Sequence, residues 1–130
     1  MAKKLVDAKV ILRYLLRDDE ILFQKASAVL EKARTGEEKI IILESVLTEC
    51  IYVLLKIYKI DRLTIAEKLR DLLYYKGIVN LDKQDLIEAI DRFGQTKLSF
   101  VDCLLIAKSK NNTMPIFTFD EELIKISRRN

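Results

Sequence analysis

The sequence predicts an α/β fold in which a parallel sheet of about four strands is flanked by helices. Four short apolar runs, rich in β-branched or aromatic residues, are typical of buried strands. Longer segments with helical periodicity separate them. Near-continuous apolar strands that alternate with helices favour a parallel sheet covered on both faces. The chain has 130 residues, the usual size of one domain, and it contains no repeat or linker. We therefore expect a single domain over residues 1–130.

The expected elements follow in chain order. The first strand leads into a helix that carries Lys9, Arg13 and Arg17 on one face, because residues four apart share a helix face. The helix over 45–59 is apolar almost all round, which predicts burial by the core and by a partner. Ser99 is a favourable N-cap for the helix over 99–110. The strands are expected at Lys4–Asp7, Lys39–Leu43, Ile78–Leu81 and Pro115–Phe119, and further helices at 20–34, 62–75, 83–93 and after Asp120.

Composition excludes several classes of protein. The chain has no histidine, so Ser-His-Asp and Cys-His catalysis and zinc sites built on histidine are absent. Its three glycines are isolated, so it has no phosphate-binding glycine loop. No apolar run is long enough to span a membrane, and charged residues near the N-terminus argue against a signal peptide. We expect a cytoplasmic protein whose Cys50 and Cys103 are buried thiols.

Four acids are placed so that the fold would gather them. Asp7 and Asp120 end the first and last strands, and the carboxyl ends of parallel strands share the edge where such folds bind ligands. Glu49 lies early in the helix that leaves the second strand. Asp102 lies in the first turn of the helix that returns to the fourth strand, so it starts from the same edge. All four acids are therefore expected at one rim.

A divalent cation would explain this arrangement. Glu49 and Asp102 project from largely apolar helix faces, where an unpaired charge is costly. Four neighbouring carboxylates would also repel one another. Mg²⁺ and Mn²⁺ take oxygen ligands, and such a cation can activate water for attack on phosphorus. This chemistry needs no histidine.

Each acid also has a structural interpretation. Ser99 with Asp102 resembles a capping box, and Asp7 and Asp120 could each cap the helix that follows. Glu49 could be a solvated side chain or interact with the helix dipole. These interpretations remain open for the acids taken singly, although convergence of all four is less easily explained by them.

The chain resembles the PIN-domain family, in particular ribonucleases of the VapC toxin type. The matching segments follow the family order, span essentially the whole chain, and are more specific together than singly. They are Leu5–Leu15, Ser45–Leu54, Leu98–Leu105 and Phe117–Asp120.

The resemblance implies an endoribonuclease that uses Mg²⁺ or Mn²⁺ held by Asp7, Glu49, Asp102 and Asp120. Thr118 matches a hydroxyl position beside the last acid, where it would orient that ligand. Relatives of this type are typically homodimers that cut RNA. They are inhibited by a cognate antitoxin whose tail covers the active site.

One departure bears on activity. Lys9 stands where the family usually has Asn, and it could pair with an acid, weaken metal binding or contact RNA phosphate. A catalytically degenerate PIN-like module that binds RNA or protein is therefore the main alternative. Lys9, Arg13, Arg17 and Lys97 are the candidate phosphate contacts, although ordinary surface charge explains each of them equally well.

A phospho-acceptor receiver domain is a further alternative. It would need an acidic pair after the first strand, an acceptor Asp after a middle strand and a Lys after the last. The first strand here offers only Asp7, and Asp120 stands in place of the Lys. The sequence therefore favours the nuclease.

Overall fold

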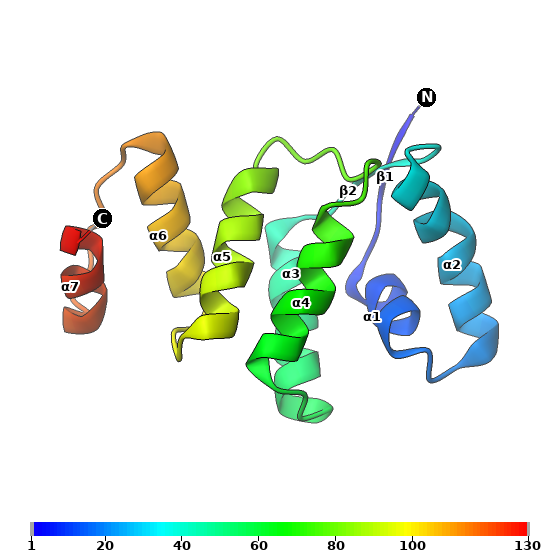
Figure 1. Ribbon diagram of the computed structural model, residues 1–130, viewed down its shortest axis with the longest axis horizontal. Coiled ribbons are helices and arrows are strands. Elements are labelled where there is room, and N and C mark those ends of the chain that lie inside the picture. The colour runs from blue at the N-terminus through cyan, green and yellow to red at the C-terminus, as the bar shows by residue number, and fades with distance from the viewer. Residues whose placement is uncertain (1, 130) are drawn as a thin grey trace.

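The computed structural model describes residues 2–129, and it is rich in helices around a small parallel sheet (Figure 1). The α/β class and the parallel direction of the sheet are confirmed. In chain order the elements are β1 (Lys3–Leu5), α1 (Ala8–Leu16), α2 (Glu20–Thr35), β2 (Lys39–Ile41), α3 (Glu44–Tyr52), the π-helical turn η1 (Val53–Ile57), α4 (Arg62–Leu73), α5 (Lys83–Gln95), α6 (Phe100–Asn112) and α7 (Glu121–Arg129).

The sheet is smaller than the sequence predicts. Strands β1 and β2 pair in parallel, with Lys4 opposite Ile40. The expected third strand is reduced to one bridge between Ile40 and Ile78. The expected fourth strand, at Pro115–Phe119, is not a strand in the part of the chain that the structure describes. The sheet of about four strands is thus two strands and a bridge.

A side chain replaces the missing part of the third strand. The N–H of Ile42 donates to Oδ1 of Asn80 at 2.9 Å, and Nδ2 of Asn80 donates back to the carbonyl of Ile42 at 2.6 Å. Nδ2 also donates to Asp82 at 3.2 Å. These contacts extend the hydrogen bonding of the sheet from Ile40 to Ile42. The side chain of Asn80 makes them, because the backbone pairing of this segment ends with the bridge at Ile78. They hold the segment from which α3 begins.

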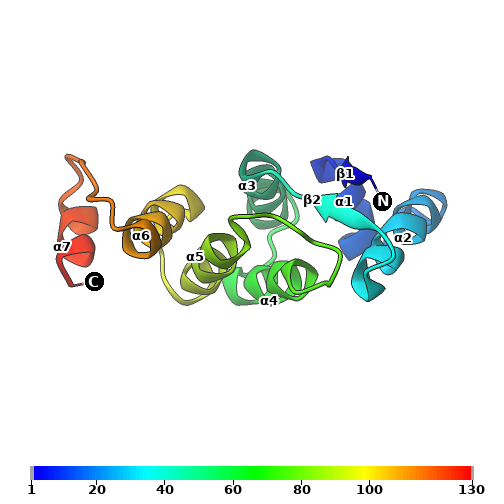
Figure 2. The same cartoon turned by 90° about the horizontal axis from the view of Figure 1, so that it is seen from above.

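The core lies where the helices face the sheet and one another. Helix α1 packs on α2 and α3, while α4, α5 and α6 pack in succession (Figures 1 and 2). The segment over 45–59 is buried on one side only, because Tyr52, Ile57 and Tyr58 are exposed. The largest fully buried side chains include Ile11, Leu30, Ile40, Leu47, Leu54, Ile65, Leu69 and Phe93.

Capping residues set where the helices begin. Asp7 accepts the N–H of Val10 at 3.1 Å at the start of α1. Ser99 caps α6, and Asp120 accepts the N–H of Leu123 at 2.9 Å at the start of α7. The interpretation that Asp7 and Asp120 cap helices is confirmed, since each satisfies a backbone N–H that has no partner within its helix.

No helix in residues 2–129 combines the length and the apolar character that crossing a bilayer requires.

Candidate functional site

Asp7 and Glu49 lie on either side of one packing contact. Helix α1 packs against α3, and the thiol of Cys50 faces the carbonyl of Ala8 at 3.9 Å. Burial, together with the negative charges of Glu49 and Asp7, raises the pKa of the Cys50 thiol to about 12. Asp7 and Glu49 directly precede Ala8 and Cys50, so they flank this contact, and both side chains are exposed to solvent. The packing of α1 on α3 thus places the segments that carry two of the four predicted acids side by side.

Asp102 lies on the neighbouring helix. It occupies the first turn of α6 and is half-buried, and its N–H donates to Oγ of Ser99 at 3.1 Å. Helix α6 packs against α3, and a groove between them is lined by Thr48 and Val101, the residues that precede Glu49 and Asp102. Glu49 and Asp102 therefore stand on helices that pack against each other.

Asp120 caps α7, and this helix lies away from β1, the strand that leads to Asp7. Helix α7 packs on α6, and both views place it and β1 toward opposite ends of the molecule (Figures 1 and 2). Thr118 contacts Asp120 locally, since its Oγ1 accepts the N–H of Asp120 at 3.1 Å. The physical reason is the missing fourth strand. Because residues 115–119 do not pair beside β1, Asp120 is not carried to the edge where Asp7 lies.

The expected metal site is therefore not assembled within one chain. Across residues 2–129, no three acidic, cysteine or histidine side chains come together in a way that could hold a metal ion. The donor chemistry fits Mg²⁺ or Mn²⁺, because all four acids offer carboxylate oxygens. Their arrangement does not fit, because α7, which Asp120 caps, lies away from β1, the strand that leads to Asp7 (Figure 1).

The predicted basic stripe is mostly occupied by contacts within the chain. Arg13 pairs with Asp18 at 3.2 Å and donates to the hydroxyl of Tyr58 at 3.2 Å, a hydrogen bond that raises the pKa of Arg13. Arg17 pairs with Glu20 at 3.3 Å. Lys9 is exposed, and none of the ion pairs found in the described residues involves it. Of the three residues in this stripe, Lys9 is therefore the one that is available to contact a phosphate group.

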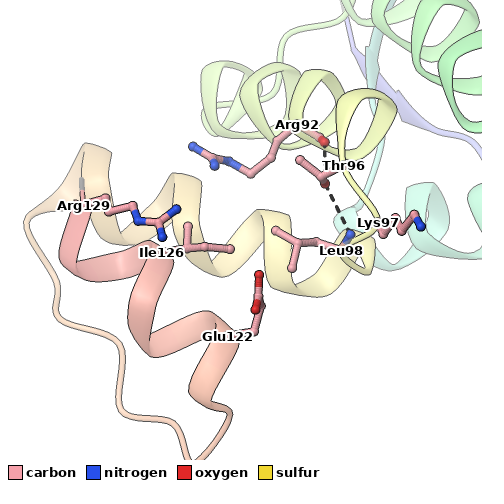
Figure 3. Close-up of a pocket in the computed structure, with 7 residues that line it drawn as sticks. All are labelled: Arg92, Thr96, Lys97, Leu98, Glu122, Ile126 and Arg129. Atoms are coloured by element: carbon pink, nitrogen blue, oxygen red, sulfur yellow. Dashed lines mark hydrogen bonds between the residues drawn. The ribbon is translucent and has the colours of Figure 1, made fainter.

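A second basic region was not apparent from the sequence. A pocket between the turn before α6 and α7 is lined by Arg92, Lys97 and Arg129, with Glu122 opposite (Figure 3). The side chain of Lys97 points away from the two arginines (Figure 3). Arg92 and Arg129 lie far apart in sequence and occupy helices of mixed charge, so no spacing pattern links them. Arg92 is on α5 and Arg129 is on α7, and the packing of both helices on α6 brings them together.

An ion-pair network near the start of α3 was also not predicted. Nζ of Lys108 lies 3.4 Å from Glu44, 3.7 Å from Asp82 and 3.6 Å from Asp85. Burial acts to lower the pKa of Lys108, but these three carboxylates raise it overall. Lys108 thus neutralises an acidic cluster and ties α3, α5 and α6 together.

Comparison with known families identifies the class of protein. The PIN domain family matches residues 4–129, and the chain belongs to it. No curated protein and no solved structure matches the chain. PIN domains are generally nucleases, and they typically use divalent metal ions.

Proposed function

We propose that the protein is a metal-dependent endoribonuclease that hydrolyses RNA phosphodiester bonds. The observation that carries the proposal is the packing of α1 on α3, where Asp7 and Glu49 flank the contact between Ala8 and Cys50, in a chain that belongs to the PIN-domain family. Because the chain has no histidine, carboxylates are the groups that would carry out acid–base chemistry at the sheet edge where Asp7 lies. Asp102 on the facing helix is the third acid, and Asp120 is the fourth.

Mg²⁺ or Mn²⁺ is the proposed cofactor. A bound cation of this kind lowers the pKa of a ligand water and stabilises the leaving oxygen of a phosphodiester. Asp7 already uses one oxygen to cap α1, which fixes its side chain at the end of β1. Asp120 likewise uses one oxygen to cap α7 by accepting the N–H of Leu123, and Oγ1 of Thr118 accepts the backbone N–H of Asp120.

RNA is the proposed substrate, held by its phosphates. Lys9 lies two residues from Asp7, is exposed and has no ion-pair partner among the described residues. Arg92 and Arg129 line the pocket beside the turn that leads to Asp102. Phosphate contacts of this kind provide affinity without sequence preference.

Within the cell, we propose a cytoplasmic VapC-type toxin that acts as a homodimer and is held inactive by a cognate antitoxin. The apolar groove beside β1 supports binding of a protein partner, because it lies next to Asp7. Its lining includes Leu5, Val10, Leu22 and Val29, with Lys4, Lys9 and Lys25 at its rim. An acidic, amphipathic antitoxin tail fits this combination of charge and apolar surface.

A second candidate is a PIN-like module that binds RNA or protein without cutting. It is favoured by one observation, the separation of α7, which Asp120 caps, from β1 (Figure 1). A rim with three acids or fewer would bind a cation weakly, because Mg²⁺ and Mn²⁺ sites depend on several oxygen ligands.

RNA cleavage by the purified protein distinguishes the two candidates. We expect cutting of a mixed RNA pool in Mn²⁺ or Mg²⁺ that EDTA abolishes. Glu49→Gln should lower the rate by about 100-fold or more, because it removes a ligand charge. Glu67→Gln is the matched control, because Glu67 is an exposed acid on α4 outside the site, and it should cut like the wild type. A folded wild-type protein that binds RNA but does not cut it in either metal would establish the binding module.

The toxin role needs a test in cells. Expression of the wild-type chain in a bacterial host should arrest growth, and Glu49→Gln should not. Arrest by both variants at equal protein levels would separate toxicity from this site.

A further inference from the structure

The pocket between α5, α7 and the turn before α6 has the size and the lining of a ligand site. Its volume is about 460 Å³, and ligand pockets occupy roughly 300–1,000 Å³. Leu98 and Ile126 form apolar walls, and the charged side chains of Arg92, Glu122 and Arg129 also line it. Apolar walls with a few polar groups that orient the ligand are characteristic of such sites. The positions of the charged groups therefore indicate which ligand fits.

The charged groups stand at two ends of the pocket. Glu122, Ile126 and Arg129 follow one another on α7 at intervals of four and three residues, so they share one face of that helix. Seven residues of helix rise about 10 Å, which separates Glu122 from Arg129 along this wall. Arg92 comes from the last turn of α5. Figure 3 shows the guanidinium groups of Arg92 and Arg129 at one end of the pocket and the carboxylate of Glu122 at the other.

Hydrogen bonds hold the floor between these two ends in place. Oγ1 of Thr96 donates to the carbonyl of Arg92 at 2.8 Å and accepts the N–H of Leu98 at 3.3 Å (Figure 3). The guanidinium of Arg62 lies 3.8 Å from the centre of the Phe93 ring, and it donates to the carbonyls of Phe93, at 3.0 Å, and of Leu98. These contacts fix the turn before α6. A ligand therefore meets a floor that is already formed, which avoids the cost of ordering it on binding.

The pocket holds more positive than negative charge. Arg92 and Arg129 contribute two positive charges and Glu122 contributes one negative charge, while the side chain of Lys97 points away (Figure 3). None of the ion pairs found in residues 2–129 involves Arg92, Arg129 or Glu122. Guanidinium groups bind phosphate through paired N–H donors, whereas a carboxylate only accepts hydrogen bonds. The ligand that fits therefore carries a phosphate at one end, N–H donors at the other, and an apolar ring between them.

We propose that this pocket binds one guanine nucleotide of the RNA substrate, with Arg92 and Arg129 on its phosphate and Glu122 on its base. Guanine presents two adjacent N–H donors, at N1 and N2, and the two carboxylate oxygens of Glu122 accept both. Adenine and cytosine offer one amino group beside a ring nitrogen that is an acceptor, and uracil offers one N–H between two carbonyls. Because a carboxylate repels an acceptor that faces it, Glu122 selects guanine over the other three bases.

The choice of RNA as the source of this nucleotide rests on the proposed function. The pocket adjoins the turn that leads into α6, and Asp102 lies in the first turn of that helix. A guanine held in the pocket therefore stands beside the phosphodiester bond that the acids would hydrolyse. Phosphate contacts alone carry no sequence information, so Glu122 is the residue that determines where the RNA is cut.

Calorimetry with nucleoside monophosphates in EDTA tests the pocket without any assay of cleavage. GMP should bind the full-length chain about tenfold more tightly than AMP, CMP or UMP, because it makes one more hydrogen bond to a charged group. IMP, which keeps the N1 donor of guanine but lacks its 2-amino group, should bind with an affinity between those of GMP and AMP. Equal affinities for all five nucleotides would show that only the phosphate is recognised, and this result would overturn the proposal.

A substitution at Glu122 should change which base is preferred. Glu122→Gln should lose the preference for GMP and favour AMP, because an amide offers one acceptor and one donor, which match N6 and N1 of adenine. Glu121→Gln is the matched control, since Glu121 is also exposed at the start of α7 but does not line the pocket. It should keep the wild-type order of affinities. An unchanged preference for GMP in Glu122→Gln would contradict base recognition by this carboxylate.

The phosphate end of the pocket has its own test. Arg92→Ala and Arg129→Ala should each weaken binding of every nucleotide by about tenfold, because each loses a charged hydrogen-bond donor, and the preference for GMP should remain. Arg128→Ala is the matched control, because Arg128 is exposed next to Arg129 and does not line the pocket. It should bind GMP as the wild type does. An equal loss in Arg128→Ala would show that only overall charge matters, and it would exclude this phosphate site.

Short RNAs distinguish a nucleotide within RNA from a free nucleotide. In EDTA, the pentanucleotide UUGUU should bind more tightly than UUAUU and more tightly than GMP, and Glu122→Gln should abolish the advantage of UUGUU over UUAUU. Binding of GMP without a difference between the two RNAs would assign the pocket to a free nucleotide and overturn its role in RNA recognition. If the protein cuts no RNA in Mn²⁺ or Mg²⁺, the proposed function fails, while these binding measurements still decide what the pocket holds.

Discussion

Asn80 should contribute much more to stability than a half-buried asparagine in a connecting segment ordinarily does. Its side chain accepts the N–H of Ile42 at 2.9 Å and donates to the carbonyl of Ile42 at 2.6 Å. Ile42 is fully buried, so Asn80→Ala leaves a backbone donor and a backbone acceptor without partners. Each such group costs about 1–3 kcal/mol. We expect the free energy of unfolding to fall by about 2–4 kcal/mol, which lowers Tm by roughly 10 °C for a domain of this size.

A second substitution separates the two hydrogen bonds. Asn80→Asp keeps an acceptor for the N–H of Ile42, but it turns a carboxylate oxygen toward the carbonyl of Ile42 and toward Asp82. At pH 7 it should therefore be at least as destabilising as Asn80→Ala. Near pH 4 part of the loss should be recovered, because protonation of the introduced carboxyl restores a donor.

Urea denaturation followed by circular dichroism measures both effects. Asn112→Ala is the matched control, since Asn112 is exposed and donates only to Lys108 within its own helix at 2.9 Å. It should change stability by less than about 0.5 kcal/mol. The reasoning is refuted if Asn80→Ala is as stable as Asn112→Ala, or if Asn80→Asp is more stable than Asn80→Ala at pH 7.

Three further predictions concern the site and the core. Lys9→Asn should tighten Mn²⁺ binding about five-fold by calorimetry, since it removes a positive charge worth about 1 kcal/mol of repulsion near the acids; unchanged or weaker binding would assign Lys9 another role. Gly77→Ala should lower the free energy of unfolding by about 3 kcal/mol or more, because its Cβ would lie 2.0 Å from the carbonyl oxygen of Glu38; near-wild-type urea stability would contradict this contact. The free energy of unfolding should fall by about 2–3 kcal/mol between pH 8 and pH 10. Burial raises the pKa values of Cys50 and Cys103 from 9.0 to about 12 and about 11, so only the unfolded chain loses these protons in that range; an equal fall in the Cys50→Ala, Cys103→Ala double variant would exclude the thiols as the cause.

The helices were predictable from the sequence because local chemistry sets them. Helix α2 begins at Glu20 after Asp19, which accepts the N–H of Leu22 at 3.1 Å, and it ends at Gly36 with φ 92°. These capping signals are local, so the segment over 20–34 was expected to within one residue. Ser99 marks the start of α6 in the same way.

The sheet was less predictable because pairing depends on residues distant in sequence. The sequence of Ile78–Leu81 is typical of a strand, yet its backbone pairs with the sheet only at Ile78, which bridges to Ile40. The next contact, to Ile42, is made by the side chain of Asn80. Pro115–Phe119 has strand chemistry, but in one chain no edge lies beside it. The sequence of a segment indicates its tendency to form a strand, but it does not show whether a free strand edge lies beside that segment in the fold.

The site was predictable in its residue types and only partly in its assembly. Parallel strands that share an edge predict that Asp7 and Glu49 lie near each other, and in the structure these residues flank the contact between Ala8 and Cys50 where α1 packs on α3. Asp120 was expected at the same rim because a fourth strand would carry it there. Arg92 and Arg129 share no sequence signal, and they line one pocket because α5 and α7 both pack on α6.

The rate of RNA cleavage against Mn²⁺ concentration tests the central claim most directly. The account predicts a saturable, EDTA-sensitive rate for the wild type, and a curve for Asp102→Asn that is shifted to about 100-fold higher metal or flattened to background, because one oxygen ligand with its charge is lost. A rate for Asp102→Asn that matches the wild type at every Mn²⁺ concentration, or cutting that persists in EDTA, would contradict catalysis at these carboxylates.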